Sequence, residues 1–391
     1  MRIIYYCLPG LLEHVPQEVS ALAERVELHV VFEVSPSAWA NNLLDLPYPA
    51  QGIGLHDARD FLRANLPTGA ASHFSKARSV SLAVYPKLYD PRGMITLGKI
   101  LLHIRSLRPD VVHFDGESIR SAVLSLFIDI PVVLNVHEPT VPMGSSLPTL
   151  ALAKRLMISR CKQIIVHSNT CRNALMAKRA IDDDRITAIP LGPLEIYKAW
   201  NGKRRVSNSG EKVVLLLGNL SIRKGIDVFV EAIPKIAGSV RNVAFVIAGR
   251  PVGRYELPKT CRLQNGSRLE LITRRLRCTE LAKLLRESTV LVMPYREIMQ
   301  SGVLLTAIGF AKPFVASNIE GLREQVEIFQ SGTLFQAGNP EDLATRVVEL
   351  LQNLDALASA EARMARLLAT DDTWDLFGQK AHEVWERATS E

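Results

Sequence analysis

The chain has 391 residues, of which 47% are hydrophobic and 22% charged. That length exceeds the roughly 250–300 residues that one hydrophobic core serves, so we expect two folded domains. The five cysteines are odd in number and form no C-x-x-C pair, which argues against a disulfide scaffold and a zinc ribbon. No apolar run reaches the ~18 residues of a membrane-spanning helix, and the N-terminus lacks the apolar core of a signal peptide, so we expect a cytoplasmic protein.

The net charge of +7 is unevenly distributed. Residues 151–300 hold 28 Lys+Arg and 12 Asp+Glu, a net of +16, and the rest of the chain holds 19 and 28, a net of −9. A basic centre suits a cleft for an anion, or a surface for anionic lipid or nucleic acid. We expect no nucleic-acid partner, because aromatic residues make up only 6% and no nucleic-acid-binding motif is present.

Short apolar runs alternate with helical patterns along the first half of the chain. In chain order we expect strands at Ile3–Cys7, Val26–Phe32, Val111–Phe114, Pro131–Val136, Gln163–Val166 and Ile186–Ile189. Helical patterns lie between several of them, at Val15–Ala23, Ile95–Leu107 and Thr170–Ala180. Residues 35–94 are the least regular part, with six prolines and weak periodicity.

The same alternation restarts after a polar segment. Strands are expected at Lys212–Leu217, Val243–Ala248, Leu269–Ile272, Thr289–Met293 and Pro313–Ala316, and helices at Asp227–Ala237, Thr279–Arg286, Val303–Phe310 and Glu341–Leu351. Strand–helix alternation predicts an α/β fold with two Rossmann-like, doubly wound parallel sheets. We expect domains at residues 1–198 and 212–368, a linker at 199–211, and a ligand cleft between the two domains.

A glycine-bounded basic loop follows the first strand of the second domain. Gly218 and Asn219 end the strand, and Arg223 and Lys224 precede Gly225 and a helix. Glycine allows a close approach to the backbone, and a helix N-terminus with two cations favours an anion such as a diphosphate. From this stretch alone, a solvated surface turn is about as good an interpretation.

A second loop of the same kind follows the strand that ends near Pro294. Tyr295 and Glu297 lie in the loop, and Gln300, Ser301, Gly302 and Val303 open an apolar helix with Ser301 as N-cap. Two anion-binding loops at one sheet edge are harder to explain as accident than either one alone.

These motifs resemble family 4 glycosyltransferases of the GT-B fold. The resemblance includes Ile247–Gly249, Pro294–Arg296 and Gln300–Ala316, and in the first half Arg108–His113, Asn135–Pro139, Val166–Ser168 and Ile189–Gly192. It implies two domains facing each other across a cleft, a nucleotide-sugar donor held mainly by the second domain, and retention of the anomeric configuration. It also implies that residues 369–391 form a final helix that packs back on the first domain.

The resemblance assigns roles to individual residues. His137 would contact the transferred sugar, Arg223 and Lys224 would stabilise the leaving diphosphate, and Gly10 would lie near it. Without the resemblance, His137 could equally be a loop histidine. The donor would be bound by residues from the two loops: Gly218, Asn219, Tyr295, Glu297, Gln300, Ser301, Gly302, Val303 and Thr306.

The sequence also departs from the family pattern. Asn219 stands where the family usually has arginine, and Thr306 stands in place of the second glutamate of a conserved pair. The loop Tyr-Arg…Gln-Ser-Gly-Val matches a variant often found in exopolysaccharide clusters. Thr306 can hydrogen-bond a ribose hydroxyl, though more weakly than a carboxylate can.

The expected chemistry needs no metal and no cofactor. The family generally neutralises the diphosphate with cationic side chains and helix N-termini. Asp182–Asp184 resembles the D-x-D metal motif of another glycosyltransferase fold, but it precedes a strand and so lies at the wrong sheet edge, which favours a solvated turn.

The stretch Ser72–Ile100 interleaves five basic residues and one acid with apolar residues. Two interpretations stay open for it: a surface resting on the inner face of an anionic membrane, or a plain acceptor-side loop.

The sequence therefore predicts a glycosyltransferase that moves a sugar from a nucleotide sugar to a hydroxyl of a glycan or lipid-linked acceptor. Two alternatives remain. One is a non-catalytic nucleotide-sugar-binding or scaffold protein of the same fold, and the other is another GT-B enzyme such as an epimerase or a phosphorylase.

Overall fold

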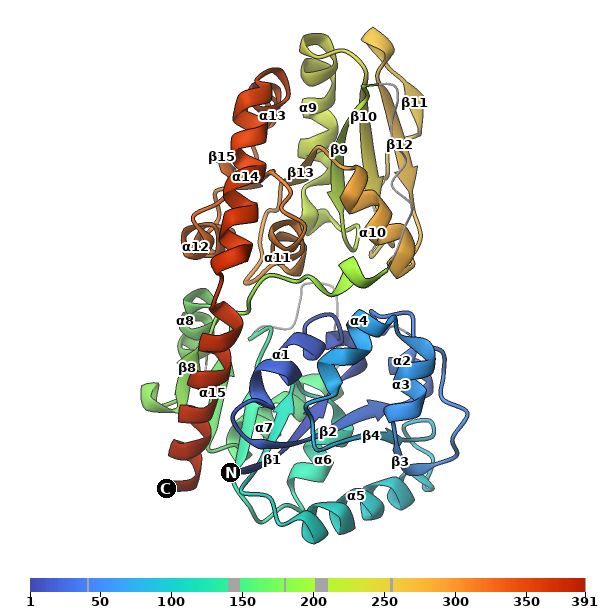
Figure 1. Cartoon of the computed structure of the whole chain (residues 1–391), viewed down its shortest axis with the longest axis vertical. Coiled ribbons are helices and arrows are strands. Elements are labelled where there is room, and N and C mark those ends of the chain that lie inside the picture. The colour runs from blue at the N-terminus through green and yellow to red at the C-terminus, as the bar shows by residue number, and fades with distance from the viewer. Residues whose placement is uncertain (41, 140–147, 179–180, 201–209, 254–255, 391) are drawn as a thin grey trace. The chain divides into compact units, whose positions relative to one another are not determined.

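The computed structural model describes residues 1–40, 42–139, 148–178, 181–200, 210–253 and 256–390 (Figure 1). The chain forms two compact units. Unit 1 comprises Met1–Gly192 and Asp372–Glu391, and unit 2 comprises Pro193–Asp371. The division at Gly192 precedes the expected domain end at residue 198, and residues 201–209 of the expected linker lie outside the described part of the chain.

Unit 1 is built on an eight-stranded sheet in the order β3-β4-β2-β1-β5-β6-β7-β8. All strand pairs are parallel except β3 with β4. The central strands are apolar and buried on both faces, as a parallel sheet covered by helices requires. The strands are β1 (Arg2–Cys7), β2 (Glu27–Val34), β3 (Gly54–Asp57), β4 (Ser79–Val84), β5 (Val111–Asp115), β6 (Val132–Asn135), β7 (Gln163–Val166) and β8 (Ile186–Ala188).

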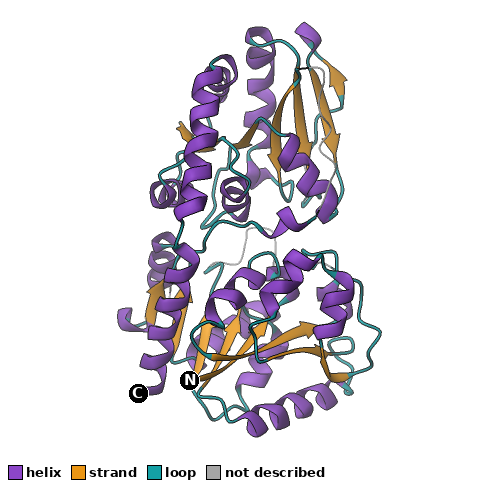
Figure 2. Cartoon of the chain, viewed as in Figure 1, coloured by secondary structure: helices purple, strands orange, loops and turns teal. Residues whose placement is uncertain are grey.

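Helices cover both faces of this sheet (Figure 2). They are α1 (Val15–Leu22), α2 (Pro36–Trp39), α3 (Arg59–Asn65), α4 (Thr68–Ala71), α5 (Gly93–Leu107), α6 (Ile119–Ser125), α7 (Pro148–Arg160), α8 (Asn169–Lys178) and α15 (Thr373–Ser390), with short 3₁₀ turns η1 (Pro9–Leu11), η2 (Ser72–Phe74) and η3 (Asp183–Arg185). The C-terminal helix α15 belongs to unit 1 and packs against α1 and against β5–β7.

The irregular stretch 35–94 contains two strands that the sequence analysis did not predict. Ser79–Val84 forms β4, which pairs with β2 and is almost wholly buried. Its sequence SVSLAV carries serines on a strand that is buried on both faces, so its hydrophobic signal is weak. The basic stretch Ser72–Ile100 is therefore not one continuous surface, because β4 runs through its middle.

Unit 2 repeats the design with a seven-stranded sheet in the order β11-β12-β10-β9-β13-β14-β15, in which only β11 with β12 is antiparallel. The strands are β9 (Lys212–Leu217), β10 (Val243–Ala248), β11 (Cys261–Arg262), β12 (Arg268–Ile272), β13 (Val290–Met293), β14 (Phe314–Ser317) and β15 (Thr333–Phe335). The helices are α9 (Ile226–Ser239), α10 (Cys278–Glu287), α11 (Gly302–Gly309), α12 (Glu320–Phe329), α13 (Pro340–Gln352) and α14 (Leu354–Thr370), and 3₁₀ turns are η4 (Ile196–Ala199), η5 (Ile222–Lys224) and η6 (Gln264–Gly266).

One core of unit 2 joins the sheet to two helices on one face. Phe229 and Ile233 of α9 and Val347 of α13 pack with Phe245 of β10 in this cluster, and all four are at most 2% exposed. The two doubly wound sheets predicted from the alternation of strands and helices are thus confirmed.

Candidate active site

The loop after β9 in unit 2 lies directly against the loop after β13. Gly225, between η5 and α9, has a left-handed backbone with φ 60°. A β-carbon at Gly225 would lie 1.8 Å from the carbonyl oxygen of Pro294, so only glycine permits this close approach. The backbone N–H of Arg296 also donates to the carbonyl of Arg223 at 2.8 Å. The two loops predicted to bind an anion are therefore joined at neighbouring strand ends.

Lys224 lies where these loops meet. Its Nζ is 3.6 Å from the centre of the Tyr295 ring, which is fully buried. This cation–π contact positions the ammonium group. A β-carbon built on Gly218 would lie 3.5 Å from Val303 Cγ2 and 3.8 Å from Lys224 Cε. The structure thus brings Gly218, Lys224, Tyr295 and Val303 together.

Arg223 has an acidic neighbour that the sequence analysis placed at the donor. Its Nε is 2.9 Å from the carboxylate of Glu297, and the two side chains are 24% and 53% exposed. The ion pair fixes the guanidinium at the rim of the loop. Glu297 therefore contacts Arg223 in this structure, whichever group it meets when a donor is bound.

The helix α11 begins as the sequence predicts. Ser301 is its N-cap, and the hydroxyl accepts from the N–H of Leu304 at 3.3 Å. The N–H of Ser301 itself donates to Gln325 Oε1 at 2.8 Å. Gly302 and Val303 occupy the first turn, where backbone N–H groups have no partner within the helix. This N-terminus adds a partial positive charge beside Lys224.

Other predicted donor residues differ in their surroundings. Asn219 is exposed and Gln300 is partly buried. Thr306 is buried, and its hydroxyl donates to the carbonyl of Gly302 at 2.8 Å. Because its proton is used in this bond, Thr306 can only accept a hydrogen bond from a ligand, through the lone pairs of its oxygen. Gly10 lies in η1 of unit 1, where a β-carbon would meet no atom within 4 Å, so its conformation does not require glycine.

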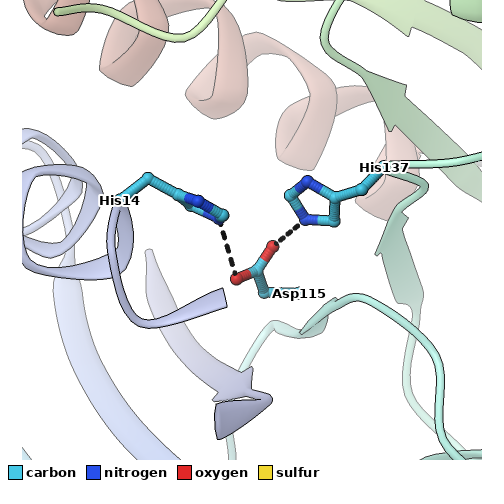
Figure 3. Close-up of side chains that lie close together, drawn as sticks. All are labelled: His14, Asp115 and His137. Carbon is cyan, nitrogen blue, oxygen red and sulfur yellow. Dashed lines mark hydrogen bonds and ion pairs between the residues drawn. The ribbon is translucent and has the colours of Figure 1, made fainter. Parts of the chain in front are cut away.

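His137 of unit 1 belongs to a buried polar cluster at the carboxyl ends of β5 and β6 (Figure 3). Its Nε2 lies 2.7 Å from Oδ1 of Asp115, the last residue of β5. Asn135, at the end of β6, donates to the same oxygen at 3.0 Å, and its Oδ1 accepts from His113 Nε2 at 2.8 Å. Trp385 of α15 extends the chain of contacts, donating to His113 Nδ1 at 3.1 Å.

His14, just before α1, approaches Asp115 from the opposite side (Figure 3). Its Nε2 is 3.5 Å from Asp115 Oδ2 and 3.9 Å from Glu18 Oε1. Glu18 accepts a hydrogen bond of 2.5 Å from the Tyr5 hydroxyl. The His137 ring lies between those of His14 and His167, with centroids 5.0 and 4.7 Å away.

Burial and charge shape the protonation of this cluster. Burial raises the pKa of Glu18, whereas the neighbouring His137 and His14 hold the pKa of Asp115 well below its usual value despite burial. Burial lowers the pKa of His113 to about 4, so that imidazole is neutral at pH 7. Asp115 is thus the stable anion against which His137 is oriented.

Sequence reasoning identified His137 but missed Asp115, His14 and Glu18. Asp115 was indistinguishable from the final residue of an ordinary strand, and His14 and Glu18 lie in an unremarkable helix start. Their only shared signal is that β1, β5 and β6 are neighbours in the sheet, which the strand order reveals and local spacing does not.

Comparisons with known proteins agree with this architecture. Residues 17–192 match the model described as "Glycosyltransferase Family 4", and residues 211–353 match "Glycosyl transferases group 1". Glycogen synthase of Mycobacterium tuberculosis is 28% identical over 294 residues, which cover 72% of this chain and 69% of that protein. The alpha-D-kanosaminyltransferase of Streptomyces kanamyceticus is 20% identical over 259 residues, 62% of this chain and 67% of the relative.

Among solved structures, HepE of Anabaena in complex with UDP and glucose superposes with a TM-score of 0.64 and 16% identity, covering 98% of both chains. A glycosyltransferase from Rickettsia africae superposes with a TM-score of 0.62 and 14% identity, covering 99% of this chain and 98% of the other. At these identities the likeness establishes the fold.

The two sheets, with the family matches over both halves, define a nucleotide-sugar glycosyltransferase of the GT-B fold. Within that class the chain belongs to glycosyltransferase family 4. Among the described residues, no helix is both long and apolar enough to cross a membrane.

Proposed function

We propose that unit 2 holds the diphosphate of the donor with Lys224, Arg223 and the N-terminus of α11. The observation that carries this proposal is the junction of the two loops, where the Lys224 ammonium, the Gly218 backbone and the first turn of α11 converge. A full positive charge beside free backbone N–H groups favours a diphosphate. The negative charge on that group grows as the glycosidic bond breaks, so the contact strengthens in the transition state.

In this proposal the leaving diphosphate needs no metal ion. Two cationic side chains and a helix N-terminus supply the positive charge that a divalent ion supplies elsewhere. The anomeric configuration is retained, as the family resemblance implies. Asn219, Gln300 and Thr306 contribute to the nucleotide side of the donor, where the exopolysaccharide-type loop replaces the usual glutamate pair.

His137 orients the transferred sugar. Its short contact with Asp115 favours a proton on Nε2, which leaves Nδ1 as an acceptor for a sugar hydroxyl. The partly exposed edge of His137, 17% of the side chain, gives a ligand access to the ring. Asp115 acts through His137 as a positioning residue, because it is itself fully buried.

The acceptor is a glycan or a lipid-linked glycan presented at an anionic membrane surface. Around the loop 85–92 and the outer face of α5, the apolar side chains Tyr89, Met94, Ile95 and Leu102 are 88%, 62%, 50% and 65% exposed. Ile95, Lys99 and Leu102 follow the i, i+4, i+7 spacing of one helix face. Exposed lysines and arginines beside exposed apolar groups are the composition that anionic lipid attracts.

The test is a panel of nucleoside-diphosphate sugars, each incubated with the purified protein and a membrane extract as acceptor. Release of free nucleoside diphosphate that depends on the extract, with the sugar recovered in the lipid fraction, is the expected result. A protein that binds one donor but never releases its diphosphate with any acceptor would instead be a nucleotide-sugar-binding scaffold. Conversion of the sugar without transfer would indicate an epimerase.

A further inference from the structure

The cluster around Asp115 contains buried polar atoms that lack hydrogen-bond partners. They are Nε2 of His14, Oδ2 of Asp115 and Oε1 of Glu18. His14 is 4% exposed, and both acids are fully buried. An unpaired polar atom in such a place costs about 1–3 kcal/mol, and more when it is charged. The three atoms converge on one point, with His14 Nε2 at the ion-pair distances of 3.5 Å from Asp115 Oδ2 and 3.9 Å from Glu18 Oε1. A small cation among them would satisfy atoms that have no hydrogen-bond partner.

The cluster sets two carboxyl groups against two imidazoles. Glu18 and Asp115 have only His14 and His137 as ion-pair partners, and among the described residues no lysine or arginine lies within ion-pair distance of either acid. A set of imidazole and carboxyl ligands binds divalent transition metals in preference to Mg²⁺ or Ca²⁺.

The distances suit a small divalent ion. Two ligand atoms at about 2.0–2.2 Å from a tetrahedral Zn²⁺ lie about 3.3–3.6 Å apart. The separation of His14 Nε2 and Asp115 Oδ2 is 3.5 Å, longer than an ordinary N–H···O hydrogen bond but within that range. One ligand atom from each of His14, Asp115 and His137 can be chosen so that all three lie within 4.8 Å of one another.

We propose that His14, Asp115 and His137 bind a Zn²⁺ ion. The ion takes His14 Nε2, a carboxylate oxygen of Asp115 and His137 Nε2, and its fourth position is left to water. With the ion on Nε2, the His137 proton lies on Nδ1, which then donates to a sugar hydroxyl instead of accepting from it. Binding replaces the present 2.7 Å contact between His137 and Asp115 with two metal–ligand bonds. Glu18 remains outside the ligand set, near His14 and hydrogen-bonded to Tyr5.

This site is distinct from the proposed diphosphate contacts, which lie in unit 2, and it shares His137 with the proposed sugar contact. It joins three separate parts of unit 1: the segment before α1, the end of β5 and the segment after β6. An ion that binds the folded state alone stabilises it by mass action. Zn²⁺ is therefore expected to raise the thermal midpoint of unfolding, a readout that needs no knowledge of donor or acceptor.

The experiment uses untagged protein treated with a chelator and then titrated with Zn²⁺ by calorimetry, with Co²⁺ as a spectroscopic probe of mixed imidazole and carboxylate coordination. One ion per chain and a rise in the unfolding midpoint are expected. His14→Ala should weaken the affinity roughly 100-fold or more and abolish that rise. His382→Ala, which changes a histidine on α15 outside the cluster, should bind like the parent.

Absence of saturable Zn²⁺ binding by the parent would overturn the proposal and indicate that a proton on His14 balances the acids. Equal affinity in His14→Ala and the parent would overturn it too, because the ion would then lie elsewhere. Circular dichroism checks that each variant folds. If His14→Ala does not fold, His14→Gln replaces it, since glutamine keeps a polar side chain of similar reach.

Discussion

At the scale of single residues, the proposed donor site depends most on Lys224. Its ammonium is held over the Tyr295 ring, so removing it removes a preorganised charge. A charge-assisted contact is worth about 1.5–3 kcal/mol, so Lys224→Ala should weaken binding of the nucleoside diphosphate roughly 10- to 150-fold. Turnover should fall further, because the contact strengthens in the transition state.

Fluorescence or calorimetric titration with nucleoside diphosphate measures this effect. Lys235→Ala is the matched control, since Lys235 lies on α9 of the same unit and pairs with Glu341 away from the loop. If Lys224→Ala is folded, binds the diphosphate like the parent and transfers sugar at the same rate, the loop after β9 is only a surface turn.

Thr306 tests the departure from the family pattern. Its hydroxyl donates to Gly302, so a donor hydroxyl could bond only to the oxygen lone pair. Thr306→Val removes that acceptor and should weaken donor binding by roughly 0.5–1.5 kcal/mol, whereas Thr306→Glu should keep or improve it. Titration with the intact nucleotide sugar compares the two. Identical affinities in the parent and both variants would remove Thr306 from the site.

The residues that sequence patterns identified are those with a local signature. Arg223, Lys224 and Ser301 stand beside glycines and helix starts that mark a loop on the carboxyl edge of a sheet. His14, Asp115 and Glu18 have no such signature, because they meet only through the pairing of β1 with β5 and of β5 with β6. A site whose residues come from distant segments of the chain therefore cannot be predicted from local patterns without the strand order.

At the scale of elements, the junction of the β9 and β13 loops depends on Gly225. Gly225→Ala introduces a β-carbon that would lie 1.8 Å from the Pro294 carbonyl oxygen, in addition to the left-handed strain of about 1–2 kcal/mol. Gly338→Ala isolates the strain alone, because Gly338 has φ 76° and open space around it. Thermal unfolding should show a clearly larger loss for Gly225→Ala. Equal losses would mean that the two loops tolerate separation.

The helix α15 gives a second element to test. Trp385 is fully buried in unit 1 and donates to His113, so Trp385→Ala leaves both a cavity and an unpaired imidazole nitrogen. A loss of about 3–5 kcal/mol is expected. Denaturant unfolding followed by circular dichroism measures it. Leu376→Ala, on the same helix but 36% exposed, should lower the free energy of unfolding far less. A comparable loss from Leu376→Ala would mean that α15 as a whole, and not the Trp385 contact, is sensitive to substitution.

Prediction of elements succeeded where hydrophobicity is continuous. The strands Lys212–Leu217 and Val243–Ala248 were predicted with the bounds of β9 and β10, since β10 is buried throughout and β9 is buried from Val214 onward. The sequence did not predict β4, because its serines weaken the hydrophobic pattern of a buried strand. It also did not predict β3 and β15, which are too short to show a period. The helix starting at Thr170 was predicted to reach residue 180, and residues 179–180 lie outside the described chain.

At the scale of the whole molecule, the chain concentrates its charge and its exposed apolar groups in different places. The basic excess of residues 151–300 falls mostly in unit 2, where the donor phosphate is proposed to bind. The exposed apolar cluster falls in unit 1, along α5 and the loop before it. Burial of β4 divides the predicted basic stretch, and the exposed apolar groups lie in the part after it, within residues 85–107, where we propose the membrane contact.

This surface predicts salt-dependent membrane binding. Lys87, Lys99 and Arg105 are exposed beside Tyr89 and the apolar face of α5. Each basic residue near anionic lipid contributes about 1 kcal/mol, roughly a fivefold change in affinity, and salt screens this attraction. The protein should therefore co-sediment with vesicles containing phosphatidylserine at low salt and dissociate as salt rises.

Charge reversal separates this surface from general basicity. Lys87→Glu should lower vesicle binding by more than the fivefold expected for loss of one charge, because the new carboxylate is also repelled. Lys259→Glu makes the same change in unit 2 and should leave binding nearly unchanged. Tyr89→Ala should weaken binding even at high salt, where apolar contact dominates. Equal sedimentation with neutral and anionic vesicles, or the same loss from Lys259→Glu as from Lys87→Glu, would show that α5 and its preceding loop do not dock on anionic lipid.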